Sequence, residues 1–163
     1  MKKISVIGLG YVGLPLYNAI AKTSLYNLIG FDIDKSRIIE LNNDFDRNYE
    51  TDKFLKKKSY NLFTSNSLFI KDSDIFIIVV PTPINAKKLP KTKQLKNACK
   101  LVSKNLKKNS IVIFESTVYP GLTEEICVPI LKKNNLDLKY NIDFFCGYSP
   151  ERINPGDKKN NIM

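Results

Sequence analysis

A glycine-rich turn between a β-branched segment and a helical pattern constrains the fold of this chain more than any other feature. Residues 3–7 (KISVI) are largely apolar, and Gly8-Leu9-Gly10-Tyr11-Val12-Gly13 follows them directly. Apolar residues then recur with helical spacing, at Leu14, Leu16, Ala19 and Ile20. A strand, a G-x-G-x-x-G turn and a helix in this order are typical of the first unit of a dinucleotide-binding sheet.

Each glycine of this motif has its own expected task. Gly8 permits the tight turn, Gly10 lets the backbone approach a pyrophosphate, and Gly13 lets the helix pack closely on the strand. The N–H groups and the positive dipole end at the helix start would then bind the phosphates. The plainer alternative is a glycine turn that connects strand to helix and binds nothing.

A second strand pattern, residues 27–32, ends in an acidic residue, Asp32. A carboxylate at roughly this distance from the glycine motif accepts hydrogen bonds from the adenosine ribose. It also repels a 2′-phosphate, which favours NAD over NADP. Lys35 and Arg37 follow closely and keep NADP open as the alternative.

The rest of the chain continues the alternation of strand and helix. We expect strands at 62–64, 75–80, 111–116 and 143–148, and helices at 36–41, 49–58, 95–106 and 123–133. Residues 75–80 (IFIIVV) are continuously apolar, as in a strand buried on both faces of a parallel sheet. Residues 81–90 contain three prolines and should form a loop. The prediction is one α/β domain over residues 1–163, a Rossmann-like doubly wound parallel sheet with helices on both faces.

Polar residues follow three of the expected strands, at the edge where ligands bind in such sheets. Thr82 comes after residues 75–80, and Thr117 comes after residues 111–116. Glu151 and Arg152 follow the last strand in a loop bracketed by prolines, which would hold an acid or base in place. In the alternative interpretation all of these residues belong to surface turns and face water.

Composition limits the classes of function. The net charge of +10 raises the question of nucleic acid, but only Arg37, Arg47 and Arg152 are arginines and the lysines are dispersed, so we expect no nucleic-acid partner. No apolar run reaches the roughly 18 residues of a membrane span, so we expect no membrane partner. The chain has three cysteines and no histidine, which argues against a His/Cys metal site and a Cys-His pair. The cysteines fit packing residues of a cytoplasmic protein.

Five segments, in order, resemble the motifs of the UDP-glucose/GDP-mannose dehydrogenase family. They are residues 8–15 (GLGYVGLP), 31–34 (FDID), 81–83 (PTP), 115–125 (ESTVYPGLTEE) and 147–157 (GYSPERINPGD). The Ser-Pro-Glu-Arg form at 149–152 is similar to the branch that acts on UDP-N-acetylhexosamines, which includes the Vi-antigen type UDP-N-acetylglucosamine 6-dehydrogenases. The resemblance covers essentially the whole chain, but only the NAD-binding domain of the family.

The resemblance implies oxidation of the C6 alcohol of a UDP-N-acetylhexosamine to the uronic acid, with NAD as cofactor, for surface polysaccharide synthesis. The residues that it places at NAD are Gly8, Gly10, Tyr11, Val12, Gly13, Asp32, Arg37, Thr82 and Thr117. Thr117 would also position a water for proton transfer, and Glu151 would act as acid and base in thioester hydrolysis. Arg152 and Ile153 would touch the nucleotide sugar.

The sugar-binding domain of the family, with its catalytic lysine and asparagine and its Gly-Gly-x-Cys nucleophile motif, has no counterpart in residues 1–163. We therefore expect this chain to be the NAD-binding half of a longer, homo-oligomeric enzyme and to be inactive alone. One alternative is a hydroxyacid dehydrogenase of the 3-hydroxyisobutyrate or 6-phosphogluconate type, which shares the glycine motif but not residues 149–156. The other is a stand-alone dinucleotide-binding module without catalysis.

Overall fold

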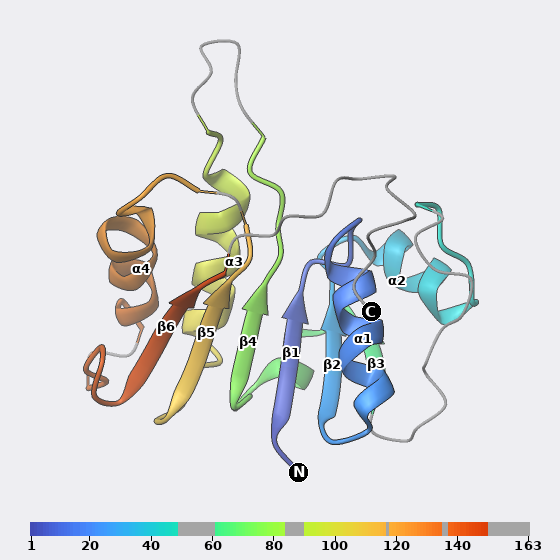
Figure 1. Ribbon diagram of the computed structural model, residues 1–163, viewed down its shortest axis with the longest axis horizontal. Coiled ribbons are helices and arrows are strands. Elements are labelled where there is room, and N and C mark those ends of the chain that lie inside the picture. The colour runs from blue at the N-terminus through green and yellow to red at the C-terminus, as the bar shows by residue number, and fades with distance from the viewer. Residues whose placement is uncertain (49–60, 84–89, 117, 135–136, 150–163) are drawn as a thin grey trace.

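A six-stranded parallel sheet in the order β3-β2-β1-β4-β5-β6 runs through the centre of the computed structural model (Figure 1). The residues that the structure describes are 1–48, 61–83, 90–116, 118–134 and 137–149. The strands are β1 (Lys3–Ile7), β2 (Asn27–Phe31), β3 (Asn61–Thr64), β4 (Ile75–Ile78), β5 (Ser110–Phe114) and β6 (Phe144–Tyr148). This is the predicted doubly wound sheet, in which the strand order reverses between β1 and β4.

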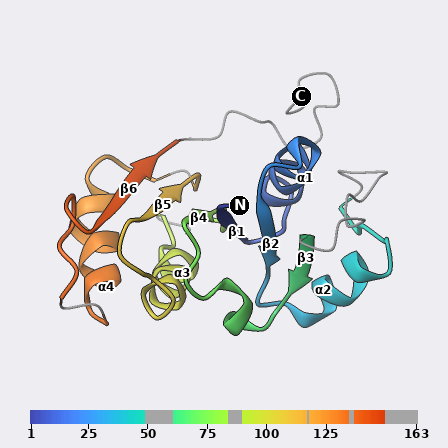
Figure 2. The ribbon, with the colours of Figure 1, turned by 90° about the horizontal axis from the view of Figure 1, so that it is seen from below.

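Helices lie on both faces of the sheet, as expected. They are α1 (Gly13–Thr23), α2 (Lys35–Asn42), the 3₁₀ turn η1 (Ser67–Ile70), α3 (Lys93–Ser103), the π-helical turn η2 (Thr123–Cys127) and α4 (Val128–Lys132). Figure 2 shows α1 on one side of the sheet and α3 and α4 on the other. Within the described ranges, no helix has the length and apolar character needed to cross a membrane.

The expected element boundaries shift where tertiary contacts end them. Strand β4 stops at Ile78 rather than at residue 80, because its neighbour β1 turns away at Gly8 and offers only the Ile7 carbonyl to Val79. The helix expected at 123–133 begins as a π-helical turn and becomes α-helical only around Pro129, which has no N–H to donate. The helix expected at 49–58 lies outside the described residues.

Two apolar clusters, one on each face, hold the helices to the sheet. On the α3 and α4 face, Phe76 and Phe114 are buried against Leu95 of α3 and Leu131 of α4. The cluster on the other face joins β1 and β2 to α1 and α2, through Val6, Leu28, Leu14, Tyr17, Ile38 and Leu41. Each such buried Leu or Phe side chain contributes roughly 1.5–3 kcal/mol, so these clusters anchor the strand ends that carry the site.

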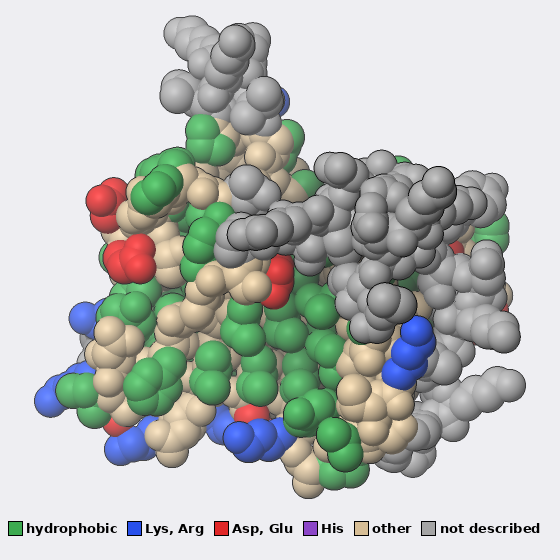
Figure 3. Space-filling view, in the orientation of Figure 1, with side chains coloured by type: hydrophobic (Ala, Val, Ile, Leu, Met, Phe, Trp, Pro, Cys, Tyr) green, Lys and Arg blue, Asp and Glu red, His purple; other side chains and the backbone are tan. Residues whose placement is uncertain are grey.

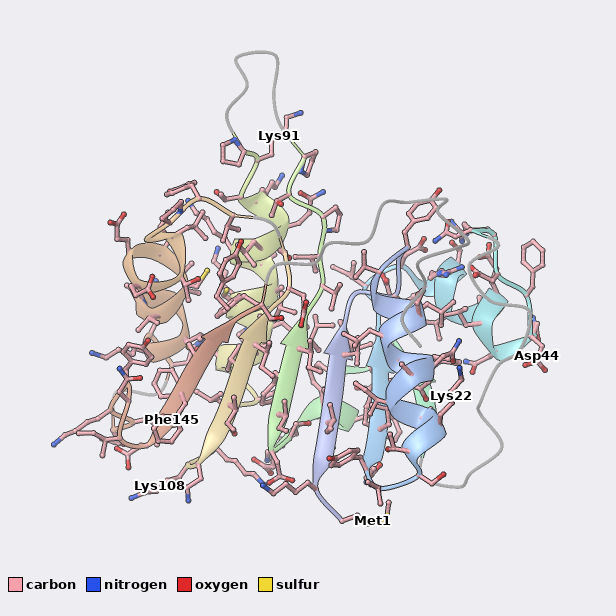
Figure 4. The ribbon with its side chains drawn as sticks, in the orientation of Figure 1. Met1, Lys22, Asp44, Lys91, Lys108 and Phe145 are labelled. Carbon is pink, nitrogen blue, oxygen red and sulfur yellow. The ribbon has the colours of Figure 1, made fainter. Side chains whose placement is uncertain are left out.

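The face that carries α1 is only half covered by the described residues. Ile4 packs in the α1 cluster, and the same row of the sheet continues through Ile75 and Ile111 to Phe145. Ile111 is 36% exposed and Phe145 is 41% exposed. Figure 3 shows this part of the sheet as a continuous apolar surface, on which Figure 4 labels Phe145. The described helices over β4, β5 and β6 therefore all lie on the opposite face.

Candidate dinucleotide-binding site

The glycine turn after β1 is shaped by close backbone contacts. Gly8 has φ +100°, and a Cβ there would lie 2.6 Å from the carbonyl oxygen of Val79. A Cβ on Gly13 would collide with the carbonyl oxygen of Gly8. At Gly10, in contrast, no described residue other than Gly10 and its two chain neighbours has an atom within 4 Å of the position that a Cβ would take. The first and third glycines are therefore required by packing, while the second opens onto free space.

The start of α1 has no side-chain cap in the described part of the chain, although the Leu14 N–H donates to the Gly10 carbonyl oxygen at 3.2 Å and Pro15 has no N–H. Val12 is the N-cap residue. The first turn of an α-helix has N–H groups without partners inside the helix, and these attract anions. Together with the open space at Gly10, the helix start fits the pyrophosphate of a dinucleotide. Tyr11, beside it, is 52% exposed.

Asp32 lies at the end of β2, directly beside the glycine turn. Its Oδ2 accepts a hydrogen bond from the Leu9 N–H at 2.8 Å, and its Oδ1 accepts one from the Asp34 N–H at 2.9 Å. The residue is half-buried. An ionised carboxylate has about four acceptor positions, so two of them stay available to the hydroxyls of a ribose.

Arg37, on α2, lies under the turn with 4% of its surface exposed. Its Nε donates a hydrogen bond to the Leu9 carbonyl oxygen at 2.9 Å, and its Nη2 lies 2.7 Å from Oδ1 of Asp46. A guanidinium buried in this way is not displayed to a 2′-phosphate, as the NADP alternative would require. The exposed basic groups nearby include Lys35 and Arg47, and Arg47 pairs with Asp34 at 3.5 Å and with Glu40 at 2.6 Å.

The loops after β4 and β5 meet beside the turn. Thr82 follows β4 and is half-buried. Ser116 is buried, and its Oγ donates a hydrogen bond to the Val80 carbonyl oxygen at 2.6 Å, which ties the end of β5 to the end of β4. Ser116 was not predicted as a site residue from the sequence, although it precedes Thr117 in the same motif. Thr117 itself lies outside the described residues.

Tyr148, at the end of β6, is a second residue that sequence reasoning did not single out. Its hydroxyl lies 3.3 Å from the carbonyl oxygen and 3.4 Å from the amide nitrogen of Val118. The side chain thus reaches from β6 to the loop after β5. Glu151, Arg152 and Ile153 follow this strand but lie outside the described residues, so their roles remain predictions.

The three cysteines lie away from this edge of the sheet. Cys99 and Cys127 are fully buried and Cys146 is half-buried, which agrees with the expected packing role. A hydrogen bond with Cys127, together with burial, raises the pKa of the Cys99 thiol well above its ordinary value. Burial raises the pKa of Cys146 to about 12. Both thiols therefore stay protonated at neutral pH. The hydrogen bond with Cys99 lowers the pKa of Cys127, but that thiol is fully buried, whereas a nucleophilic cysteine is partly exposed.

The sheet order, the glycine turn and the acidic residue after β2 define a Rossmann-type dinucleotide-binding domain. The chain belongs to the UDP-glucose/GDP-mannose dehydrogenase family, since the model of the NAD-binding domain of that family matches residues 2–163. NAD is the cofactor of this domain. The open space at Gly10, the uncapped helix start and the Asp32 carboxylate are the features that fit NAD.

Two relatives and one solved structure show how much of such an enzyme the chain represents. It is 50% identical to UDP-N-acetyl-D-glucosamine 6-dehydrogenase of Salmonella typhi and 49% identical to the same enzyme of Pseudomonas aeruginosa, over 98% of this chain and 37% of either relative. UDP-D-ManNAc dehydrogenase from Pyrococcus horikoshii superposes with a TM-score of 0.85 at 33% identity, over 94% of this chain and 37% of that one. The chain therefore spans little more than a third of the length of these proteins.

Proposed function

We propose that this chain supplies the NAD-binding half of a UDP-N-acetylhexosamine 6-dehydrogenase, which oxidises the C6 alcohol of the sugar to the uronic acid for surface polysaccharide synthesis. The observation that carries the proposal is the identity of about half of the residues with UDP-N-acetyl-D-glucosamine 6-dehydrogenases over almost the entire chain. The glycine turn and Asp32 support the cofactor side of the reaction.

The residues at the carboxyl ends of the strands contact different parts of NAD. Bound NAD supplies the acceptor for the hydride that leaves the alcohol carbon. The backbone around Gly10 holds the pyrophosphate, and the Asp32 carboxylate accepts hydrogen bonds from the ribose. Thr82 and Thr117, at the ends of β4 and β5, contact the cofactor farther along the sheet edge. Ser116 keeps those two loops together through the Val80 carbonyl.

The loop after β6 completes the proposed site on the substrate side. Thr117 positions a water for proton transfer, and Glu151 acts as acid and base when a thioester is hydrolysed. Arg152 and Ile153 contact the nucleotide sugar. The assignment of Thr117 rests on the family motif at residues 115–125. Those of Glu151, Arg152 and Ile153 rest on the motif at residues 149–156, which a hydroxyacid dehydrogenase of the 3-hydroxyisobutyrate type lacks.

The chain by itself binds NAD but does not oxidise a sugar in this proposal. Cys99 and Cys127 are buried among apolar side chains, and Cys146 lies in a strand, so the thiolate needed for a thioester is missing. The proposed enzyme is a cytoplasmic homo-oligomer with a UDP-N-acetylhexosamine as its partner, and it binds neither nucleic acid nor membrane.

Titration calorimetry with the purified chain and a chimaera test this proposal. The chimaera joins residues 1–163 to the part of the Salmonella typhi relative that the chain does not match. We expect both proteins to bind NAD more tightly than NADP. Only the chimaera should form NADH with UDP-N-acetylglucosamine, and its E151Q variant should lose that activity. NADH formation by the chain alone, or full activity of E151Q, would contradict the proposal.

A further inference from the structure

Both backbone polar groups of Leu9, between the first two glycines of the turn, are held by side chains from the next β-α unit. The Leu9 N–H donates to Asp32 at 2.8 Å, and the Leu9 carbonyl oxygen accepts from Nε of Arg37 at 2.9 Å. The Leu9 side chain is fully buried. The direction of the peptide that leads into Gly10 is therefore set from α2 and the end of β2, and not by β1 alone.

Arg37 is itself held in place from the segment that follows α2. Asp46 is 6% exposed, and its Oδ1 lies 2.7 Å from Nη2 of Arg37. The same oxygen accepts a hydrogen bond from the Asn48 N–H at 3.1 Å. Glu40, one turn along α2, lies 3.7 Å from Nη1 of Arg37. A buried guanidinium has few alternative partners, so removing the Asp46 carboxylate would allow Arg37 to move.

The guanidinium makes two different contacts, a hydrogen bond from Nε to Leu9 and an ion pair from Nη2 to Asp46, where Nη2 has no hydrogen-bond partner within the described residues. It joins a backbone carbonyl on one edge to a carboxylate on the other, and a lysine has no such pair of fixed donors. Figure 4 labels Asp44 in the segment after α2 that leads to Asp46. Asp44 carries the same charge but is exposed, which makes it a matched control two residues away.

We propose that Asp46 is a positioning residue for NAD. It fixes Arg37, whose Nε holds the Leu9 carbonyl, and this contact keeps the turn in the shape that the pyrophosphate needs. The inference rests on NAD binding at the glycine turn. Loss of Asp46 should therefore weaken only ligands that carry phosphate, because the ribose is bound by Asp32 and the pyrophosphate by the turn.

Three ligands separate this role from a general loss of stability. Affinities for NAD, ADP and adenosine are measured for the wild-type chain, D46N and D44N, by calorimetry or by NMR titration. In D46N we expect NAD and ADP to bind about five to twentyfold more weakly, while adenosine changes by less than about twofold. D44N should keep all three affinities within about twofold. D46E, which restores the charge, should bind NAD more tightly than D46N.

Amide hydrogen exchange supplies a readout that does not depend on ligand. The Leu9 amide should exchange faster in D46N than in D44N, while the amides of α3 are unchanged. If D46N does not fold, R37K takes its place, because it keeps the charge beside Asp46 but loses the Nε donor. R37K should likewise bind NAD and ADP more weakly and leave adenosine binding unchanged.

A folded D46N variant with wild-type affinity for NAD and ADP would overturn the proposal. An equal loss of affinity for all three ligands would also overturn it, as would an unchanged ADP affinity in R37K. A wild-type chain that fails to bind NAD would instead count against the proposed function. In that case the exchange rate of the Leu9 amide still decides whether Asp46 positions the turn.

Discussion

The Asp32 carboxylate accepts a hydrogen bond from the Leu9 N–H, which joins the acidic residue at the end of β2 to the glycine turn after β1. One side chain thus connects the two parts of the chain that we propose to bind the adenosine half of NAD. The hydrogen bond spans 23 positions in the sequence and places the proposed ribose site beside the proposed pyrophosphate site.

Replacing Asp32 by Ala should weaken NAD binding by about 1.5–3 kcal/mol, the usual value of a hydrogen bond to a charged group. The measurement is a calorimetric titration of the purified chain. Asp137→Ala serves as the control, because Asp137 is an exposed acidic residue beyond α4. An unchanged NAD affinity in D32A would remove Asp32 from the ribose site.

The second and third glycines of the turn should respond differently to an added methyl group. Gly10→Ala has open space for its Cβ, so we expect a protein as stable as the wild type that binds NAD at least about tenfold more weakly. Gly13→Ala forces a Cβ into the Gly8 carbonyl oxygen and should lower the free energy of unfolding by about 1–3 kcal/mol or more. Urea unfolding and NAD titration of both variants check this, and a destabilised G10A or an unperturbed G13A would show that the turn has another shape.

Stability should fall in acid partly because of Asp74, at the start of β4. A hydrogen bond from Lys107 at 2.8 Å and one from the Lys3 N–H at 2.7 Å hold the pKa of this carboxyl below its ordinary value of 3.8. A lowered folded-state pKa stabilises the protein above the unfolded value, and this contribution disappears as the pH falls through the folded pKa. Thermal unfolding followed from pH 6 to below about pH 4 should therefore show a shallower loss of stability in D74N than in the wild type.

The control for this experiment is Asp137→Asn, since Asp137 is an exposed carboxylate. It should leave the pH dependence of the melting temperature as it is in the wild type. Identical acid profiles for D74N and D137N would mean that the contacts of Asp74 with Lys3 and Lys107 contribute nothing measurable.

The thiols should react slowly with iodoacetamide in the native protein at pH 8. Burial raises the pKa of Cys146 to about 12, and the hydrogen bond with Cys127 raises the pKa of Cys99, so these two thiols form little thiolate. The same hydrogen bond lowers the pKa of Cys127, which is protected by its complete burial instead. Mass spectrometry should find Cys146, the half-buried thiol, modified before Cys99 and Cys127, and all three modified at once in urea. Rapid native labelling of Cys99 or Cys127 would point to a nucleophile that the proposed function does not include.

Much of the fold was predictable because its signals are local. The apolar run that forms β4 and the alternation of strands with helical patterns depend on residues close in sequence. The roles of Gly8 and Gly13 are of the same kind, since a turn with φ +100° and a helix packed against a carbonyl leave no room for a side chain. For the same reason Asp32 was placed at the end of β2 from spacing alone.

Other features depend on contacts between distant residues and were not predictable. Arg37 looks like an exposed helix residue in the sequence, yet it is buried because the Leu9 carbonyl, 28 positions away, and the Asp46 carboxylate surround it. Ser116 acts through a carbonyl 36 positions away, and the exposure of Ile111 and Phe145 depends on which face the helices cover. The sequence by itself determined the sheet and its glycine turn, because sterics and periodicity operate over a few residues. The polar groups that hold the turn, in contrast, depend on the tertiary structure. A buried charge or carbonyl pairs with the groups that the packed chain brings within hydrogen-bond distance, and these lie far away in the sequence.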